Sequence, residues 1–187
     1  MSGGRVSGGR GATASPGPIH RPVDVRSLPA KGYVERIEAT EEERRALARA
    51  NGLPDVPRFQ AFVRVLPWGS DGVRVTGTIE AEVVQECVVS LEQLDARIEE
   101  VIETVLVPDG SPLARMEEGE VVLDADGEDP PETFTPPIVD VGALAAEFFA
   151  LALDPYPRAP DAELPVEASD AEANPFAALA GLKVGDG

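Results

Sequence analysis

The stretch VRVTGTIEAEV, residues 73–83, decides the fold class. Apolar residues and Gly77 occupy every second position, and Arg, Thr and Glu fill the positions between them. This is the alternation of a β-strand with one buried and one solvated face. The stretch FQAFVRVL, residues 59–66, alternates in the same way, and the turn-forming PWGSDG at 67–72 lies between the two. Together they predict an antiparallel β-hairpin.

The residues before this hairpin predict two short strands and a helix. PVDV at 22–25 and YVERIE at 33–38 alternate in part between apolar and polar residues. Thr40 is expected to cap a helix, because Glu43 follows at the spacing of a capping box. We expect the helix to end at Asn51-Gly52, since glycine commonly follows the last helical residue.

The residues after the hairpin are harder to assign. In DARIEEVIETVLV, residues 95–107, the apolar residues fit helical spacing, but the β-branched content favours a strand. The pattern alone leans slightly toward a helix. Residues 108–137 are acidic and rich in Pro and Gly, which predicts a long surface loop.

A second helix is expected after Asp140, which would serve as its N-cap. Its buried face is predicted to be a row at helical spacing that ends before Pro155. The members of that row are Val141, Leu144, Phe148 and Leu151.

Both ends of the chain differ in composition from the residues between them. Residues 1–19 are mostly Gly, Ser and Arg, and we expect a disordered tail, since two SGGR copies are a weak signal for RNA binding. Residues 159–187 form an acidic linker and a short helix that opens at Asn174-Pro175. The apolar edge of that helix is the predicted partner-binding segment, although docking on its own domain stays open. That edge consists of Phe176, Leu179 and Leu182.

Charge is distributed unevenly along the 187 residues. Residues 1–74 hold 12 Lys and Arg against 8 Asp and Glu, whereas residues 75–187 hold 4 against 26. Such a body repels phosphate backbones and attracts basic partners, so RNA contact is expected to be weak or indirect. The alternative, that the acidity serves only solubility, stays open.

Composition also indicates the compartment. A single cysteine makes an intramolecular disulfide impossible, and the first twenty residues contain no apolar segment typical of a secretory signal. The most apolar stretch, residues 141–153, is shorter than the roughly 20 apolar residues that span a bilayer. We therefore expect a soluble, cytoplasmic protein without membrane contact.

No catalytic, cofactor or metal site is predicted. Cys87 would need a nearby base to act as a nucleophile, but the one histidine, His20, lies at the domain edge, where we expect it to be solvated. Cys87 is expected to be a small packed residue at a strand turn. The acidic stretch DADGE at 124–128 lacks the spacing of a calcium loop, and no phosphate-binding glycine motif is present.

Four segments in this order resemble the YceD family of large ribosomal RNA subunit accumulation proteins, in the form usual for alphaproteobacteria. They are VQECVVSL at 84–91, VDVGALAAE at 139–147, LALDPYPR at 151–158 and NPFAALAGLK at 174–183. Other branches of the family carry a Cys-x-x-Cys at the turn, whereas here Val84 replaces the first cysteine. A lone thiolate cannot build a tetrahedral zinc site, so a metal or dithiol role does not carry over.

The resemblance implies an α+β domain over residues 20–158 with a largely antiparallel sheet, and it favours a strand at 95–107. In 154–158, the prolines forbid a helix, and the segment is expected to be either a structural stop or a docking surface. The positions that match the family motif are Gln85, Cys87, Asp140, Glu147, Asp154, Pro155, Tyr156, Pro157 and Arg158.

The leading functional hypothesis is a bacterial, non-enzymatic ribosome-assembly factor. The resemblance implies a role in accumulation or processing of large-subunit (23S) ribosomal RNA, and the acidic body favours binding of a basic ribosomal protein or a large-subunit precursor particle. The alternatives are an acidic adaptor unrelated to ribosomes and, less favoured, a metal-dependent hydrolase.

Overall fold

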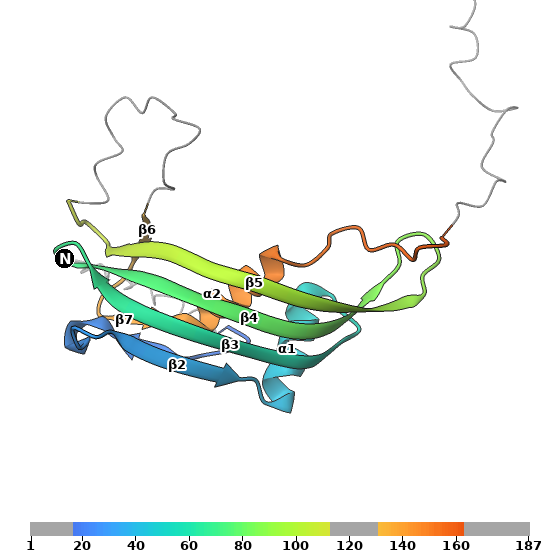
Figure 1. The fold of residues 1–187 in the computed structure, drawn as a ribbon, viewed down its shortest axis with the longest axis horizontal. Coiled ribbons are helices and arrows are strands. Elements are labelled where there is room, and N and C mark those ends of the chain that lie inside the picture. Colours follow the sequence, from blue (N-terminus) through green and yellow to red (C-terminus); the bar gives the residue numbers. More distant parts are fainter. Residues whose placement is uncertain (1–16, 113–130, 163–187) are drawn as a thin grey trace, which may run out of the picture.

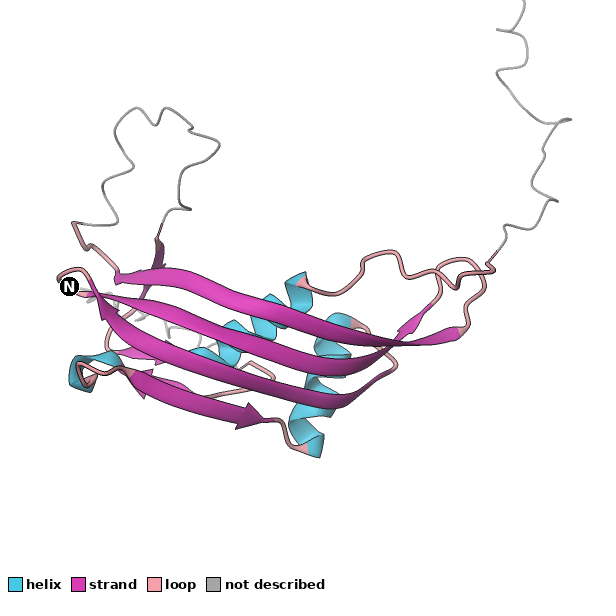
Figure 2. Cartoon of the chain, in the orientation of Figure 1, coloured by secondary structure: helices cyan, strands magenta, loops and turns pink. Residues whose placement is uncertain are grey.

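The structure, a computed structural model, describes residues 17–112 and 131–162. A five-stranded sheet has the order β2-β3-β4-β5-β6, and a separate two-stranded ladder joins β1 to β7. Two helices, α1 and α2, pack on the same face of the large sheet, and no described helix covers its other face (Figures 1 and 2). The fold is α+β with a largely antiparallel sheet, as predicted.

The centre of the sheet is an antiparallel meander of three long strands. The expected hairpin is confirmed, with β3 at Asp55–Trp68 and β4 at Gly72–Glu86. The third strand, β5, runs from Gln93 to Pro108, so the slight leaning of the pattern toward a helix was wrong. Three of its buried residues, Ile98, Ile102 and Leu106, stand four apart, and Val107 is also buried. That spacing fits one face of a strand as well as one face of a helix.

The first part of the chain forms the expected elements. Strand β1 spans Pro22–Asp24, a 3₁₀ turn follows at Val25–Ser27, and β2 spans Tyr33–Glu38. Helix α1, Glu41–Asn51, begins with the complete capping box of Thr40 and Glu43. It ends at Gly52, whose φ of 65° is the left-handed conformation that glycine adopts most readily.

One short strand lies inside the predicted surface loop, residues 108–137, and a second follows directly after it. Strand β6, Glu132–Phe134, pairs in parallel with the end of β5. Strand β7, Ile138–Asp140, pairs antiparallel with β1 and leads directly into α2. These three-residue strands have no periodicity of their own, because pairing with distant segments creates them. Residues 113–130 of the predicted loop lie outside the described residues.

Helix α2, Val141–Leu151, begins after its predicted cap, Asp140, but its buried face differs from the predicted row. Phe149 is fully buried, Phe148 is half-buried, and Leu151 is 78% exposed. Val141 and Leu144 of the predicted row are buried, and half of the buried residues are small: Gly142, Ala145 and Ala146. At Gly142, a Cβ would lie only 2.8 Å from the backbone nitrogen of Arg21, so this close approach requires glycine. The prediction followed the large apolar residues and was therefore wrong at Leu151.

The core lies between the sheet and the two helices. Phe149 of α2 meets Phe59 of β3 edge-to-face, with ring centroids 5.5 Å apart, and both side chains are buried. Ile19 is also fully buried in this core. The packed body therefore begins before residue 20, the predicted domain boundary.

Candidate functional site

The turn between β4 and β5 is held by hydrogen bonds around Cys87. The Cys87 amide donates to the Glu92 carbonyl at 2.8 Å, and the Leu91 amide donates to the Cys87 carbonyl at 2.9 Å. Leu91 has a φ of 61°, which is uncommon for a residue with a side chain. This tight turn places Cys87 in the interior and exposes Val88 and Leu91.

The segment after α2 returns to this turn and is fixed to it by backbone contacts. The buried Gln85 side chain donates from Nε2 to the Asp154 carbonyl at 2.8 Å. The Val88 amide donates to the Pro157 carbonyl at 2.9 Å. The Ala159 amide approaches the Cys87 Sγ at 3.4 Å. Gln85, Cys87 and residues 154–159 thus form one unit, which we call the turn junction.

The Cys87 sulfur acts as a hydrogen-bond acceptor in the turn junction. Contacts from the side chain and the amide of Ser90, the latter at 3.3 Å, and from the amide of Ala159 lower the pKa of the thiol to about 6, although burial opposes this shift. The sulfur is fully buried, and the structure places His20 against Asp140 instead. Within the described residues, no group of three or more His, Cys, Asp or Glu side chains could hold a metal ion.

Inside the turn junction, hydrogen bonds fix the backbone, while apolar side chains are exposed on its surface. The Asp154 carboxylate accepts the Tyr156 amide at 2.8 Å, which shapes the Pro-rich stop after α2. Tyr156 is 73% exposed and Leu91 is 67% exposed. The structural-stop and docking-surface interpretations of 154–158 are therefore compatible, because the backbone is fixed while Tyr156 and Arg158 face solvent.

Asp140 and Glu147 belong to α2 and its cap, and none of their contacts involves the turn junction. Oδ1 of Asp140 accepts the amides of Arg21, Gly142 and Ala143 at 2.8–3.1 Å, and Oδ2 lies 2.5 Å from His20 Nδ1. Burial raises the pKa of Asp140. Hydrogen bonds from the amides of Arg21 and Ala143 and from the His20 side chain lower it by more, so the net shift is downward. Glu147 is exposed. The family-motif positions therefore serve at least two separate parts of the fold.

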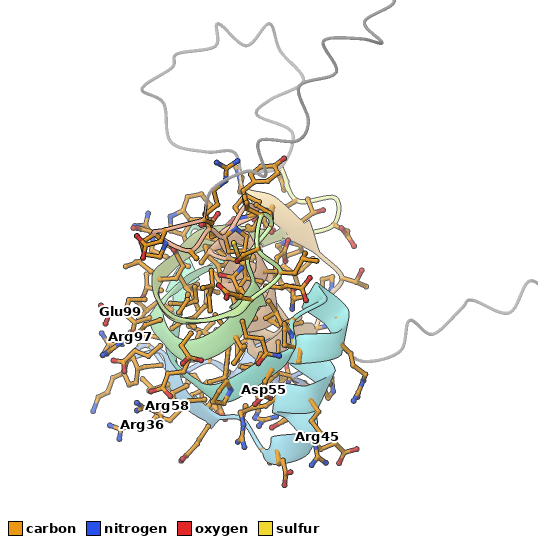
Figure 3. All side chains as sticks on the ribbon, turned by 90° about the vertical axis from the view of Figure 1, so that its right-hand side faces the viewer. Arg36, Arg45, Asp55, Arg58, Arg97 and Glu99 are labelled. Carbon is orange, nitrogen blue, oxygen red and sulfur yellow. The ribbon has the colours of Figure 1, made fainter. Side chains whose placement is uncertain are left out.

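The open face of the sheet is the second candidate surface. Figure 3 looks along the strands: Arg36, Arg58, Arg97 and Glu99 project from the side opposite α1. The β2–β3 half of this face carries Arg36, Arg58 and Arg64, whereas the β4–β5 half is acidic. The carboxylates of the acidic half, which we call the acidic face, are Glu80, Glu82, Glu86, Asp95, Glu99 and Glu103.

Few cations offset the acidic face. Arg97 lies 2.9 Å from Glu99 and 3.8 Å from Glu80, and Arg74 lies 3.6 Å from Glu103. Arg58 of the neighbouring strand β3 lies 4.0 Å from Glu82. These pairs are exposed, so each contributes little to stability and leaves the net charge negative. Sequence alone does not single out these carboxylates, although the polar positions of the alternating strand indicate that they share one face. On the basic half, Arg36 stacks over the Phe62 ring at 5.8 Å, beside a hollow of about 390 Å³.

Some predicted features lie outside the described residues. They include the DADGE stretch at 124–128 and the predicted partner-binding residues Phe176, Leu179 and Leu182. In the part of the chain that is described, no helix is long and apolar enough to cross a membrane.

Comparison with known proteins identifies the family. No curated protein and no solved structure matches the chain. The family model described as "Large ribosomal RNA subunit accumulation protein YceD" matches residues 75–183, which is more than half of the chain. The match includes the turn junction, the acidic β4–β5 strands and α2, while β1, β2, α1 and β3 precede it. The chain belongs to the YceD family.

Proposed function

We propose that the protein is a non-enzymatic factor that supports accumulation and processing of large-subunit (23S) ribosomal RNA by binding a basic ribosomal protein or a large-subunit precursor particle. The family is named for large ribosomal RNA subunit accumulation. The single observation that favours a protein ligand over naked RNA is the acidic face.

The charges on this face select the class of partner. Six carboxylates face outward on β4 and β5, against the two cations Arg74 and Arg97. Phosphate groups would be repelled here, whereas a Lys- and Arg-rich surface would be attracted. At an ionic strength of 0.1 M, charges act over about 10 Å, so binding should weaken as salt increases.

Three further contacts complete the proposal. Phe176, Leu179 and Leu182 form an apolar edge on a predicted helix, which suits insertion into a groove of the partner. The arginines near the N-terminus would touch RNA only weakly. The exposed Tyr156 and Arg158 of the turn junction are residue types that are enriched at interfaces.

Sedimentation of cell lysate on a sucrose gradient at low salt tests the proposal. We expect the full chain to migrate with large-subunit precursors. Glu82→Gln/Glu86→Gln on the acidic face should reduce this fraction more than Glu42→Gln/Glu147→Gln, which changes net charge equally at exposed sites elsewhere.

Deletion of residues 174–187 tests the terminal segment separately from the acidic face. Loss of co-migration on deletion would support the terminal segment as a docking element. Migration of the full chain only at the top of the gradient, with no ribosomal protein recovered at low salt, would contradict the proposed function and favour a non-ribosomal adaptor.

A further inference from the structure

Strand β5 has an open edge over most of its length. Its inner neighbour β4 pairs with it from Gln93 to Leu106, whereas its outer neighbour β6 pairs only with Leu106–Pro108. Among the described residues, none hydrogen-bonds to the outer backbone of residues 93–104. An exposed edge of this kind presents unpaired N–H and C=O groups to any extended chain that approaches.

The backbone groups on this edge can be identified by following the hydrogen bonds across the sheet. The Ala39 amide donates to the Phe59 carbonyl, so odd-numbered residues of β3 face β2 and even-numbered residues face β4. The register places Phe62 opposite Thr78 and Gly77 opposite Ile102. Odd-numbered residues of β4 therefore bond to even-numbered residues of β5.

Two contacts at the ends of β5 agree with this alternation. The Cys87 amide donates to the Glu92 carbonyl at one end. The Asp109 amide donates outward to the Phe134 carbonyl of β6 at the other. Odd-numbered residues from Asp95 to Glu103 thus direct their N–H and C=O groups to the open edge.

The edge already accepts one strand. Strand β6 adds to it in parallel, with Glu132 opposite Leu106. By the alternation above, Glu132 bonds to the β5 backbone between Val105 and Val107. The open stretch of the edge therefore runs from Asp95 to Glu103. The chain after α2 passes the other end of β5 (Figure 1), but its hydrogen bonds go to Gln85, Cys87 and Val88.

The side chains along the open edge indicate the charge of its occupant. Glu99 and Glu103 project from the acidic face on either side of Val101, which is 62% exposed. Glu100 points to the helix side, is half-buried and has no hydrogen bond or ion pair within the described residues. An added strand would meet carboxylates on both of its faces. The other open edge, β2, is shorter and offers Arg36 between Val34 and Glu38.

We propose that the open edge of β5, centred on residues 99–103, binds an extended Lys- or Arg-rich segment of the partner as an additional strand. This inference rests on the proposed function, because it specifies how the basic partner is held. Backbone hydrogen bonds would provide affinity, and the carboxylates on both faces would select basic side chains.

Amide hydrogen exchange on the full chain tests the inference. In the free protein, we expect the amides of Glu99, Val101 and Glu103 to exchange rapidly, while those of Glu100 and Ile102 exchange slowly. An alternating Lys/Val nonapeptide should protect the first group. A Lys/Pro peptide of equal charge should not, because proline cannot form the ladder. Slow exchange of the odd-numbered amides before any peptide is added would overturn the inference, since the chain itself would then occupy the edge. Equal affinity for both peptides would also overturn it.

A matched pair of variants tests the same edge. Val101→Pro removes an outward donor without removing a β4 hydrogen bond, and we expect it to weaken Lys/Val peptide binding about tenfold. Val101→Thr retains the amide and should bind as the wild type does. If Val101→Pro misfolds by circular dichroism, the exchange measurement on the wild type decides.

The gradient experiment distinguishes this inference from the proposed function. Co-migration of both wild type and Val101→Pro with precursor particles would overturn strand addition and leave the proposed function standing. Absence of co-migration for the wild type, together with peptide protection of the odd-numbered amides, would contradict the proposed function and support strand addition to a different basic partner.

Discussion

Replacing Phe149 with alanine is the sharpest test of how α2 is oriented on the sheet. Phe149 is fully buried against Phe59, whereas Leu151, on the same helix, is 78% exposed. The pattern of large apolar residues predicts the opposite assignment. Phe149→Ala and Leu151→Ala therefore form a matched pair.

The expected loss follows from the buried area. A buried phenylalanine removes about 150 Å² or more from water, and at roughly 25 cal/mol per Å² this corresponds to about 4 kcal/mol. Part of that area is retained by alanine, but the cavity left beside Phe59 adds a further loss, so about 4 kcal/mol remains the estimate for Phe149→Ala. Leu151→Ala should change the free energy of unfolding by no more than about 0.5 kcal/mol.

Urea unfolding followed by circular dichroism measures both values. A typical domain has a free energy of unfolding of about 5–15 kcal/mol, so Phe149→Ala should shift the midpoint far below that of Leu151→Ala. Equal losses, or a larger loss for Leu151→Ala, would refute the orientation of α2 described above.

Three further substitutions test local features. Thr40→Ala removes the N-cap of α1 and should lower the free energy of unfolding, measured with urea, by about 1 kcal/mol, whereas Thr40→Ser should retain most of it. An equal loss of unfolding free energy in both variants would contradict this role of the cap. The pKa of the Cys87 thiol is lowered to about 6 from its ordinary 9.0, so stability should rise with pH between these values as the folded state loses its proton first. Cys87→Ala should lack that rise. If the urea midpoints of the wild type and of Cys87→Ala changed with pH in the same way, this expectation would be wrong. Gln85→Ala removes the bond to the Asp154 carbonyl and should speed amide exchange at Val88 and Ala159 about tenfold, whereas the exposed neighbour Glu86→Ala should leave both unchanged.

The central hairpin and α1 could be predicted from sequence because local signals agree with the tertiary structure. Alternation marks β3 and β4, and the Thr40–Glu43 capping box marks the start of α1. In β5, three of the buried residues stand four apart, and only the neighbouring strand decides between helix and strand. The face of α2 was predicted correctly at Val141 and Leu144 but wrongly at Leu151. Half of its buried residues are glycine or alanine, which a pattern of large apolar residues does not count.

The turn junction was partly predictable. The family resemblance singled out Gln85, Cys87 and 154–158, but no pattern showed that they meet in space. Their contacts use the carbonyls of Asp154 and Pro157, and a backbone acceptor leaves no trace in side-chain chemistry. The open edge of β5 could not be predicted for a similar reason. Which of its amides face outward depends on the register across three strands, and side-chain patterns do not record that register.

The position of Phe149 also determines when the domain can complete its core during synthesis. Strands β3, β4 and β5 are consecutive in the chain, so the meander can assemble from local contacts as it emerges. Its apolar inner face stays uncovered on the Phe59 side until α2 has been translated, because Phe149 supplies the other half of that aromatic pair. A nascent chain that stalls before residue 141 therefore exposes the apolar inner face of the sheet, which makes it a target for chaperones.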